Sequence, residues 1–192
     1  KHGQLNGSTL LTDDRFGNLN SAFYFDGEDS FISLPEISCQ LGTPNSQSTL
    51  SFWFKSSAEN IPSTFIHNRS MGEGICGNDT DYLRIENFGE NNKLYVYFRG
   101  DDDIDGDNNC EYYDYSGQGP ISEISYQSNK WNHIVVTIDG QNGLYRMYLN
   151  GDMDNVISYD FNSQINFFKP NRIWEIGALG FQDMYYHNGE ID

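Results

Sequence analysis

The clearest pattern of hydrophobic and polar positions lies between Trp131 and Gly151, where two alternating segments flank a turn. In each segment every second residue is apolar, which is the period of a β-strand with one buried face. Between them, Asp139-Gly140 and Asn142-Gly143 tolerate positive φ at little cost and favour a chain reversal. The stretch predicts a β-hairpin with an inward face made of Ile134, Val136, Ile138, Tyr145, Met147 and Leu149.

Shorter segments with the same alternation follow one another along the chain. No stretch of about a dozen residues has apolar positions at the i, i+3, i+4 spacing of a helix. The 13 Tyr, 13 Phe and 19 Gly also favour short strands and tight turns. The pattern predicts an all-β protein with strands within residues 22–34, 49–56, 63–68, 81–87, 93–99, 121–126, 156–161 and 172–177.

The charge of the chain is strongly acidic, with 28 acidic and 11 basic residues and a formal net charge of −17. Nucleic acids and anionic membranes would be repelled by such a charge at long range. No apolar stretch is long enough to cross a bilayer, so we predict no membrane insertion. Cations are the favoured partners, although an acidic surface also serves solubility alone.

Four segments together resemble laminin-G-like domains of the concanavalin A-like jelly-roll superfamily. They are LTDDRFGNLNSAFYFDGEDSFISLP at 11–35, TLSFWFKSS at 49–57, the hairpin at 131–151, and the tail 176–192 that ends in GEID. The resemblance implies an antiparallel two-sheet β-sandwich formed by residues 1–192 as one domain. It also implies a secreted or cell-surface location and a place within a larger chain.

Both ends of the sequence look shortened against the family pattern. KHGQLNGSTLL resembles a part of that pattern that an initial strand normally precedes, and GEID stops where another strand usually follows. The terminal strands are therefore expected to be missing or supplied by sequence outside these 192 residues.

The most chemically distinctive stretch is DDDIDGD at residues 101–107, expected in a loop. Asp101, Asp103 and Asp105, followed by Gly106, have the spacing of the first half of an EF-hand calcium loop, in which the carbonyl of Asp107 would also be a ligand. The pattern departs from an EF-hand because position 12 is Tyr112; Glu111 or Asp114 could complete the ligand set. The alternative is a solvated acidic insertion without metal.

The family resemblance implies a second calcium site. In related jelly rolls a structural calcium is held by a backbone carbonyl near a glycine and by an aspartate late in the chain. The matching positions are Gly27 and Asp192, with Asp29 nearby. The alternative is that Asp26-Gly27 is only a good turn.

Three tyrosines, Tyr112, Tyr113 and Tyr115, lie among Asp, Asn and Gly residues in what is expected to be a loop. Aromatic rings can cover the apolar face of a sugar while neighbouring polar groups bind its hydroxyls. These tyrosines are therefore the predicted ligand-binding residues. The alternative is that they fold inward and anchor the loop.

Among the three cysteines, the first-choice disulfide joins Cys76 to Cys110 and leaves Cys39 free. Both lie a few residues beyond the ends of a hairpin predicted across residues 81–99. The two other pairings stay open.

The predicted function is that of a non-catalytic binding module, because the alternating-carboxylate motif of related glycosidases, E-x-D-x-E or E-x-D-x-x-E, does not occur in the sequence. The predicted partner is a glycan or a surface protein, with calcium as cofactor. The alternatives are a protein-adhesion domain and a polysaccharide-degrading enzyme.

Overall fold

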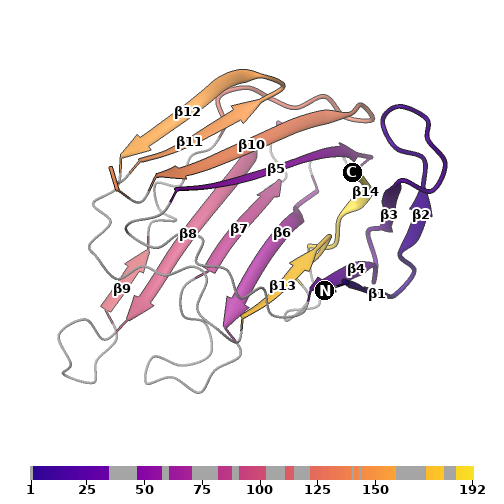
Figure 1. The fold of residues 1–192 in the computed structure, drawn as a ribbon, viewed down its shortest axis with the longest axis horizontal. Coiled ribbons are helices and arrows are strands. Elements are labelled where there is room, and N and C mark those ends of the chain that lie inside the picture. The colour runs from indigo at the N-terminus through magenta and orange to yellow at the C-terminus, as the bar shows by residue number, and fades with distance from the viewer. Residues whose placement is uncertain are drawn as a thin grey trace.

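The computed structural model describes residues 2–34, 47–57, 61–70, 82–87, 91–102, 111–114, 122–139, 141–142, 144–158, 172–179 and 185–192. Within these residues the chain forms two seven-stranded sheets and contains no helix. All strand pairs are antiparallel, and Figure 1 shows the two sheets as layers. The prediction of an all-β antiparallel sandwich is confirmed.

The first sheet, named here the β6 sheet, contains six strands from residues 4–114 and one late strand. In space these strands follow the order β1-β4-β13-β6-β7-β8-β9. Their bounds are Gln4–Asn6 (β1), Phe31–Leu34 (β4), Ser63–Ser70 (β6), Tyr82–Asn87 (β7), Leu94–Asp102 (β8), Glu111–Asp114 (β9) and Arg172–Ile176 (β13).

The second sheet, named here the β5 sheet, contains the hairpin that the sequence predicts most clearly. Its strands follow the order β12-β11-β10-β5-β14-β3-β2. Their bounds are Leu10–Thr12 (β2), Ala22–Asp26 (β3), Gln47–Ser56 (β5), Asn132–Asp139 (β10), Leu144–Leu149 (β11), Asp152–Ser158 (β12) and Asn188–Ile191 (β14).

The turn between β3 and β4 carries the chain from one sheet to the other. Oδ1 of Asp26 accepts hydrogen bonds from the backbone N–H groups of Glu28, Asp29 and Ser30 at 2.9, 3.2 and 3.2 Å. Partial burial alone would raise the pKa of Asp26, but these donors outweigh it and lower the pKa to about 2. The turn predicted at Asp26-Gly27 is present, and its strands belong to different sheets.

The C-terminal residues form β14, which lies between β5 and β3 rather than at an edge (Figure 1). The backbone of Asp192 exchanges two 2.9 Å hydrogen bonds with Trp53 of β5. The N-terminal strand β1 instead lies at the edge of the β6 sheet. The expectation that further terminal strands exist beyond this sequence stays a prediction.

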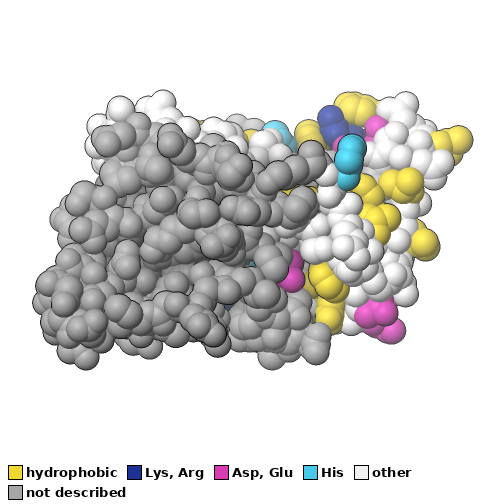
Figure 2. All heavy atoms as spheres, turned by 60° about the horizontal axis from the view of Figure 1, so that its bottom comes forward, with side chains coloured by type: hydrophobic (Ala, Val, Ile, Leu, Met, Phe, Trp, Pro, Cys, Tyr) yellow, Lys and Arg dark blue, Asp and Glu magenta, His cyan; other side chains and the backbone are white. Residues whose placement is uncertain are grey.

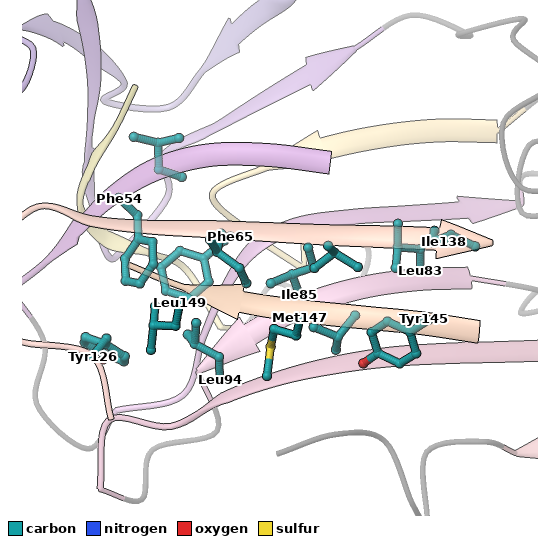
Figure 3. Close-up of a cluster of buried hydrophobic side chains, with 14 of the residues drawn as sticks. Phe54, Phe65, Leu83, Ile85, Leu94, Tyr126, Ile138, Tyr145, Met147 and Leu149 are labelled. Carbon is teal, nitrogen blue, oxygen red and sulfur yellow. The ribbon is translucent and has the colours of Figure 1, made fainter. Parts of the chain in front are cut away.

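The core is formed where the inward faces of the two sheets meet. The alternating inward set predicted for the hairpin is buried, and its members pack in one cluster with residues of the β6 sheet (Figure 3). The rings of Phe54 and Phe65, from opposite sheets, have centroids 4.5 Å apart, and Tyr126 meets Phe54 edge-on at 5.3 Å. An irregularity in the β6–β7 register leaves Phe65 without a paired residue on β7.

The structure differs from the sequence predictions mainly where strands are short. Strands β1 and β2 are each three residues long and were not predicted. Residues 122–126 form no strand, although one was predicted there. Instead the loop is fixed by Asp154, whose carboxylate accepts the backbone N–H groups of Glu123 and Ile124 at 3.0 and 2.7 Å.

Candidate functional site

The predicted acidic calcium loop begins inside a strand. Asp101 belongs to β8, where its backbone pairs with Tyr112 of β9. The prediction that Asp101 lies in a loop is therefore wrong, because β8 runs three residues further than its alternation indicated. Asp103, Asp105 and Asp107 lie outside the described residues, so calcium binding there stays a prediction.

The residues of the second implied calcium site lie apart. Asp26 and Phe23 pair with Asn188 and Ile191, so Gly27 and Asp192 lie at opposite ends of the β3–β14 pair. The four-residue step along an extended strand separates them by at least roughly 13 Å. Asp29 accepts the Ser8 N–H at 2.9 Å, and Asp192 pairs with Arg15. Gly27, Asp29 and Asp192 therefore form no common ligand set.

Two of the three predicted ligand-binding tyrosines lie in a strand rather than in the expected loop. Tyr112 and Tyr113 belong to β9, the edge strand of the β6 sheet. Tyr115 lies outside the described residues, as do Cys76 and Cys110. Within the described part of the chain, no group of three or more His, Cys, Asp or Glu side chains is placed to hold a metal ion.

The outward face of the β6 sheet carries a row of ionisable side chains. Glu175, His67 and Arg84 pair in sequence across β13, β6 and β7. Oε2 of Glu175 lies 3.4 Å from Nδ1 of His67, and Oε2 of Glu86 lies 3.0 Å from Nε of Arg84. Both carboxylates are buried, with exposed fractions of 4% for Glu175 and 1% for Glu86. A large ligand could not reach this row in the described conformation.

The outward face of the β5 sheet is open and carries aromatic and polar side chains. The His133 imidazole stacks on the Trp53 indole with centroids 4.6 Å apart and 12° between ring planes. Nε2 of His133 also lies 2.9 Å from Oγ of Ser51. Burial lowers the pKa of His133, and the nearby charge of Arg15 lowers it further. His133 is thus held as a neutral ring on a neutral indole at physiological pH.

A polar cleft of about 340 Å³, named here the Tyr148 cleft, lies further along the same face. Pairing of Thr137 with both Thr49 and Arg146 brings β5, β10 and β11 together there. Tyr148 and Arg146 point outward because they alternate with Met147, which is buried in the core. The cleft is lined by Gln47, Ser48, Thr49, Thr137, Ile138, Asp139, Arg146 and Tyr148.

The two charged side chains that line the Tyr148 cleft are Asp139, which has hydrogen-bond partners, and Arg146, which has no carboxylate partner among the described residues. Asp139 accepts hydrogen bonds from the Asn142 side chain and backbone at 2.8 and 3.2 Å, and these bonds lower its pKa. The Asp139 carboxylate therefore stays ionised, and each of its oxygens accepts one hydrogen bond from Asn142. Among the described residues, no carboxylate lies within ion-pair distance of the Arg146 guanidinium.

The Tyr148 cleft was not predicted from the sequence, although one signal was present. The alternation that put Tyr145, Met147 and Leu149 inward also put Arg146 and Tyr148 outward. The sequence did not reveal that β5 pairs with β10, which adds the polar residues of a distant segment.

Exposed hydrophobic side chains gather at the opposite end of the β5 sheet, near the N-terminus. Figure 2 shows them on the described part of the surface, at the end where β1–β4 lie in Figure 1. Phe16 and Leu19, in the loop between β2 and β3, have exposed fractions of 74% and 77%. Leu5, Leu10 and Leu11 add to this apolar end.

A known family covers most of the chain. The family model described as "Concanavalin A-like lectin/glucanases superfamily" matches residues 26–192. No curated protein matches the chain. In the described residues no helix is both long and apolar enough to cross a bilayer.

Solved structures share the fold at low sequence identity. Domain 4 of AbnA, an extracellular arabinanase of Geobacillus stearothermophilus solved with arabinotriose, has a TM-score of 0.61 and 18% identity; the match covers 97% of this chain and 73% of that one. The Ruminococcus gnavus IT-sialidase CBM40 with α2,3-sialyllactose has a TM-score of 0.55 and 13% identity, and the match covers 97% of this chain and 88% of that one. The binding domain of Paraclostridial Mosquitocidal Protein 1 has a TM-score of 0.62 and 16% identity, and the match covers 100% of this chain and 42% of that one.

Proposed function

The chain belongs to the concanavalin A-like lectin/glucanase superfamily, and we propose that it is a non-catalytic carbohydrate-binding module of a larger extracellular protein. The observation that carries this proposal is the Tyr148 cleft. It places one aromatic ring beside hydroxyl, amide and guanidinium groups on an open sheet face. Sugars need this combination, because a ring covers their C–H surface and polar groups bind their hydroxyls.

The absence of catalysis is part of the proposal and has its own support. Glycoside hydrolysis requires two carboxyl groups that reach the scissile bond. Glu86 and Glu175 are buried beside Arg84 and His67, so neither reaches a polysaccharide in this conformation. We expect polysaccharides that bind the protein to remain intact, with no release of reducing ends.

The extracellular location rests on similarity to other proteins. The arabinanase that contains a similar domain is an extracellular enzyme, and that domain is solved with arabinotriose. The similar sialidase domain is solved with a sialylated sugar. These neighbours support, for this chain, a role in attaching a larger protein to glycans. Calcium at Asp101, Asp103, Asp105 and Asp107 is the proposed cofactor.

A glycan array with the wild-type protein, run with calcium and with EDTA, tests the proposed function. Tyr148→Ala is expected to lose roughly two- to tenfold in affinity, because one aromatic stacking contact contributes about 0.5–1.5 kcal/mol. Tyr24→Ala is the matched control, since Tyr24 is an exposed tyrosine on β3 of the same sheet and lies outside the cleft. Tyr112→Ala tests the tyrosines first predicted. Absence of binding to every glycan would reject the proposed function.

Protein adhesion is the second candidate, and the exposed apolar end favours it. Phe16 and Leu19 lie in a loop that is held by hydrogen bonds to Asp14. Large exposed apolar side chains on an ordered loop are typical of protein contacts. This function predicts binding to an array of purified surface proteins that Phe16→Ser with Leu19→Ser abolishes. Glycan binding that the same double variant leaves unchanged would favour the first candidate.

A further inference from the structure

The guanidinium of Arg146 is the starting point, because it lines a cleft without a carboxylate partner among the described residues. It lies on β11, directly across from Thr137 of β10. Hydroxyl-bearing side chains line the same cleft, namely Ser48, Thr49, Thr137 and Tyr148. Its alternation with the buried Tyr145 and Met147 fixes the side chain on the outward face. A planar guanidinium in this position has free donors that suit a carboxylate.

Other basic groups on this face are already occupied. Lys55 pairs with Glu190 at 2.9 Å, and Arg15 pairs with Asp192. On the described strands of the β5 sheet, Lys55 and Arg146 are the Lys and Arg side chains, so Arg146 is the one still available for an external anion. In a chain of net charge −17, one available cation in a cleft is a strong local determinant of what binds.

The surroundings of Arg146 indicate a sugar acid rather than an inorganic anion. Tyr148 supplies a ring two residues along the same strand face, and the hydroxyl groups of Thr49 and Thr137 lie across the neighbouring strands. Asp139, two residues from Thr137 on β10, is an ionised acceptor that would repel a second negative charge and accept a hydroxyl hydrogen bond. The cleft thus suits a ligand with one carboxylate, several hydroxyls and an apolar ring face.

We infer that the Tyr148 cleft selects acidic saccharides, with Arg146 binding the carboxylate and Tyr148 packing on the sugar ring. The carboxylate can belong to a uronic acid or to a sialic acid, since both present the same group. This inference rests on the proposed glycan-binding function and specifies its ligand class.

Isothermal titration with matched probe pairs tests the inference and separates the two sources. One pair is tri-galacturonate and its fully methyl-esterified form, and the other is sialyllactose and lactose. The wild-type protein is expected to bind the acidic member of at least one pair roughly tenfold or more tightly. Raising the ionic strength should weaken that binding, because the contact is between charges.

Variants at Arg146 locate the effect. Arg146→Gln is expected to remove the preference for the acidic member, and Arg146→Lys to restore it only partly because an ammonium lacks the bidentate fork. Lys130→Gln is the matched control, since it removes the same charge from an exposed residue outside the cleft. Urea unfolding of each variant shows whether the fold is retained.

The outcomes are distinct. Equal binding of acidic and neutral probes, or an acidic preference that Arg146→Gln leaves intact, overturns the inference while the glycan-binding function stands. No binding to these probes or to any glycan on the array overturns both.

Discussion

The imidazole of His133 and the indole of Trp53 are stacked on the open face of the β5 sheet, with 4.6 Å between centroids. The guanidinium carbon of Arg15 lies 4.9 Å from the centroid of the same indole and 4.3 Å from that of Phe16. Arg15 also pairs with Asp192. These contacts attach the loop between β2 and β3 to the centre of the sheet.

Removal of the Arg15 charge should release this loop. Arg15→Gln is expected to lower the free energy of unfolding by about 0.5–2 kcal/mol, the range for one cation–π contact and one exposed ion pair. Hydrogen exchange at the N–H groups of Phe16 and Asn18, which Asp14 accepts, should become faster. Lys55→Gln is the control, because it removes another paired cation from the same face. Unchanged exchange in Arg15→Gln would mean that the contacts do not hold the loop.

The alternation of side chains predicted the parts of this fold that depend on neighbours in sequence. Ile134 and Met147 could be placed in the core because strand periodicity assigns each residue to a face without knowledge of its partner strand. The edge strands β1, β2 and β9 were missed because they are short, and three or four residues provide too few alternations to distinguish from a loop.

The candidate site could not be predicted in the same way, because it depends on which strands become neighbours. Ser51 and His133 are 82 residues apart and meet only when β5 pairs with β10. The same pairing brings Thr49 to Thr137 in the Tyr148 cleft. Local patterns gave the outward direction of Tyr148, but the pairing that surrounds it is a long-range property of the sandwich.

A second prediction concerns His187, which is fully buried in the core beside Phe25 and Phe65, with ring centroids 5.9 and 4.9 Å away. Burial lowers its pKa to about 3, and a backbone hydrogen bond with Glu190 opposes that shift only in part. The folded pKa lies below the unfolded value, so the unfolded chain binds the proton first. The contribution of neutral His187 to the free energy of unfolding is therefore fully present above about pH 6.5, and it is lost as the pH decreases towards about 3.

Urea unfolding at two pH values measures this effect. Between about pH 7.5 and about pH 5, His187 should lower the free energy of unfolding by about 2 kcal/mol. The loss begins only below the unfolded pKa of about 6.5 and is about 1.4 kcal/mol per pH unit. His187→Gln should lose that part of the pH dependence, whatever its effect on absolute stability. His2→Gln, at an exposed histidine, should retain it. Equal pH dependence in all three proteins would show that His187 is not the titrating group.

The predicted calcium site gives a third prediction, centred on Asp103 and its neighbouring aspartates. After EDTA treatment, added calcium should produce a binding heat and raise the unfolding temperature. At a calcium concentration about a hundredfold above the dissociation constant, the stabilisation should be about 2.7 kcal/mol. Asp103→Asn should abolish both effects, while Asp152→Asn, which removes an exposed carboxylate from β12, should not. If EDTA-treated protein shows no calcium heat, the acidic stretch is a solvated insertion.

The last prediction concerns Gly189 of β14, which lies against the backbone of Lys55 on β5. Its φ is +146°, and a Cβ placed there would lie 1.9 Å from the backbone oxygen of Lys55. Strand β14 is hydrogen-bonded to β3 on one side and to β5 on the other, so it cannot move away from Lys55 without breaking strand pairing. Gly189→Ala should therefore lower the free energy of unfolding by more than about 3 kcal/mol, since steric overlap adds to the backbone cost.

Gly151 provides the matched control for that steric term. Its φ is +91°, but a Cβ there meets no atom within 4 Å. Gly151→Ala should cost only the conformational part, about 1–2 kcal/mol. The difference between the two variants in urea unfolding, followed by tryptophan fluorescence, isolates the overlap with Lys55. Similar losses in both would mean that β14 is not packed between β3 and β5 as closely as the structure places it.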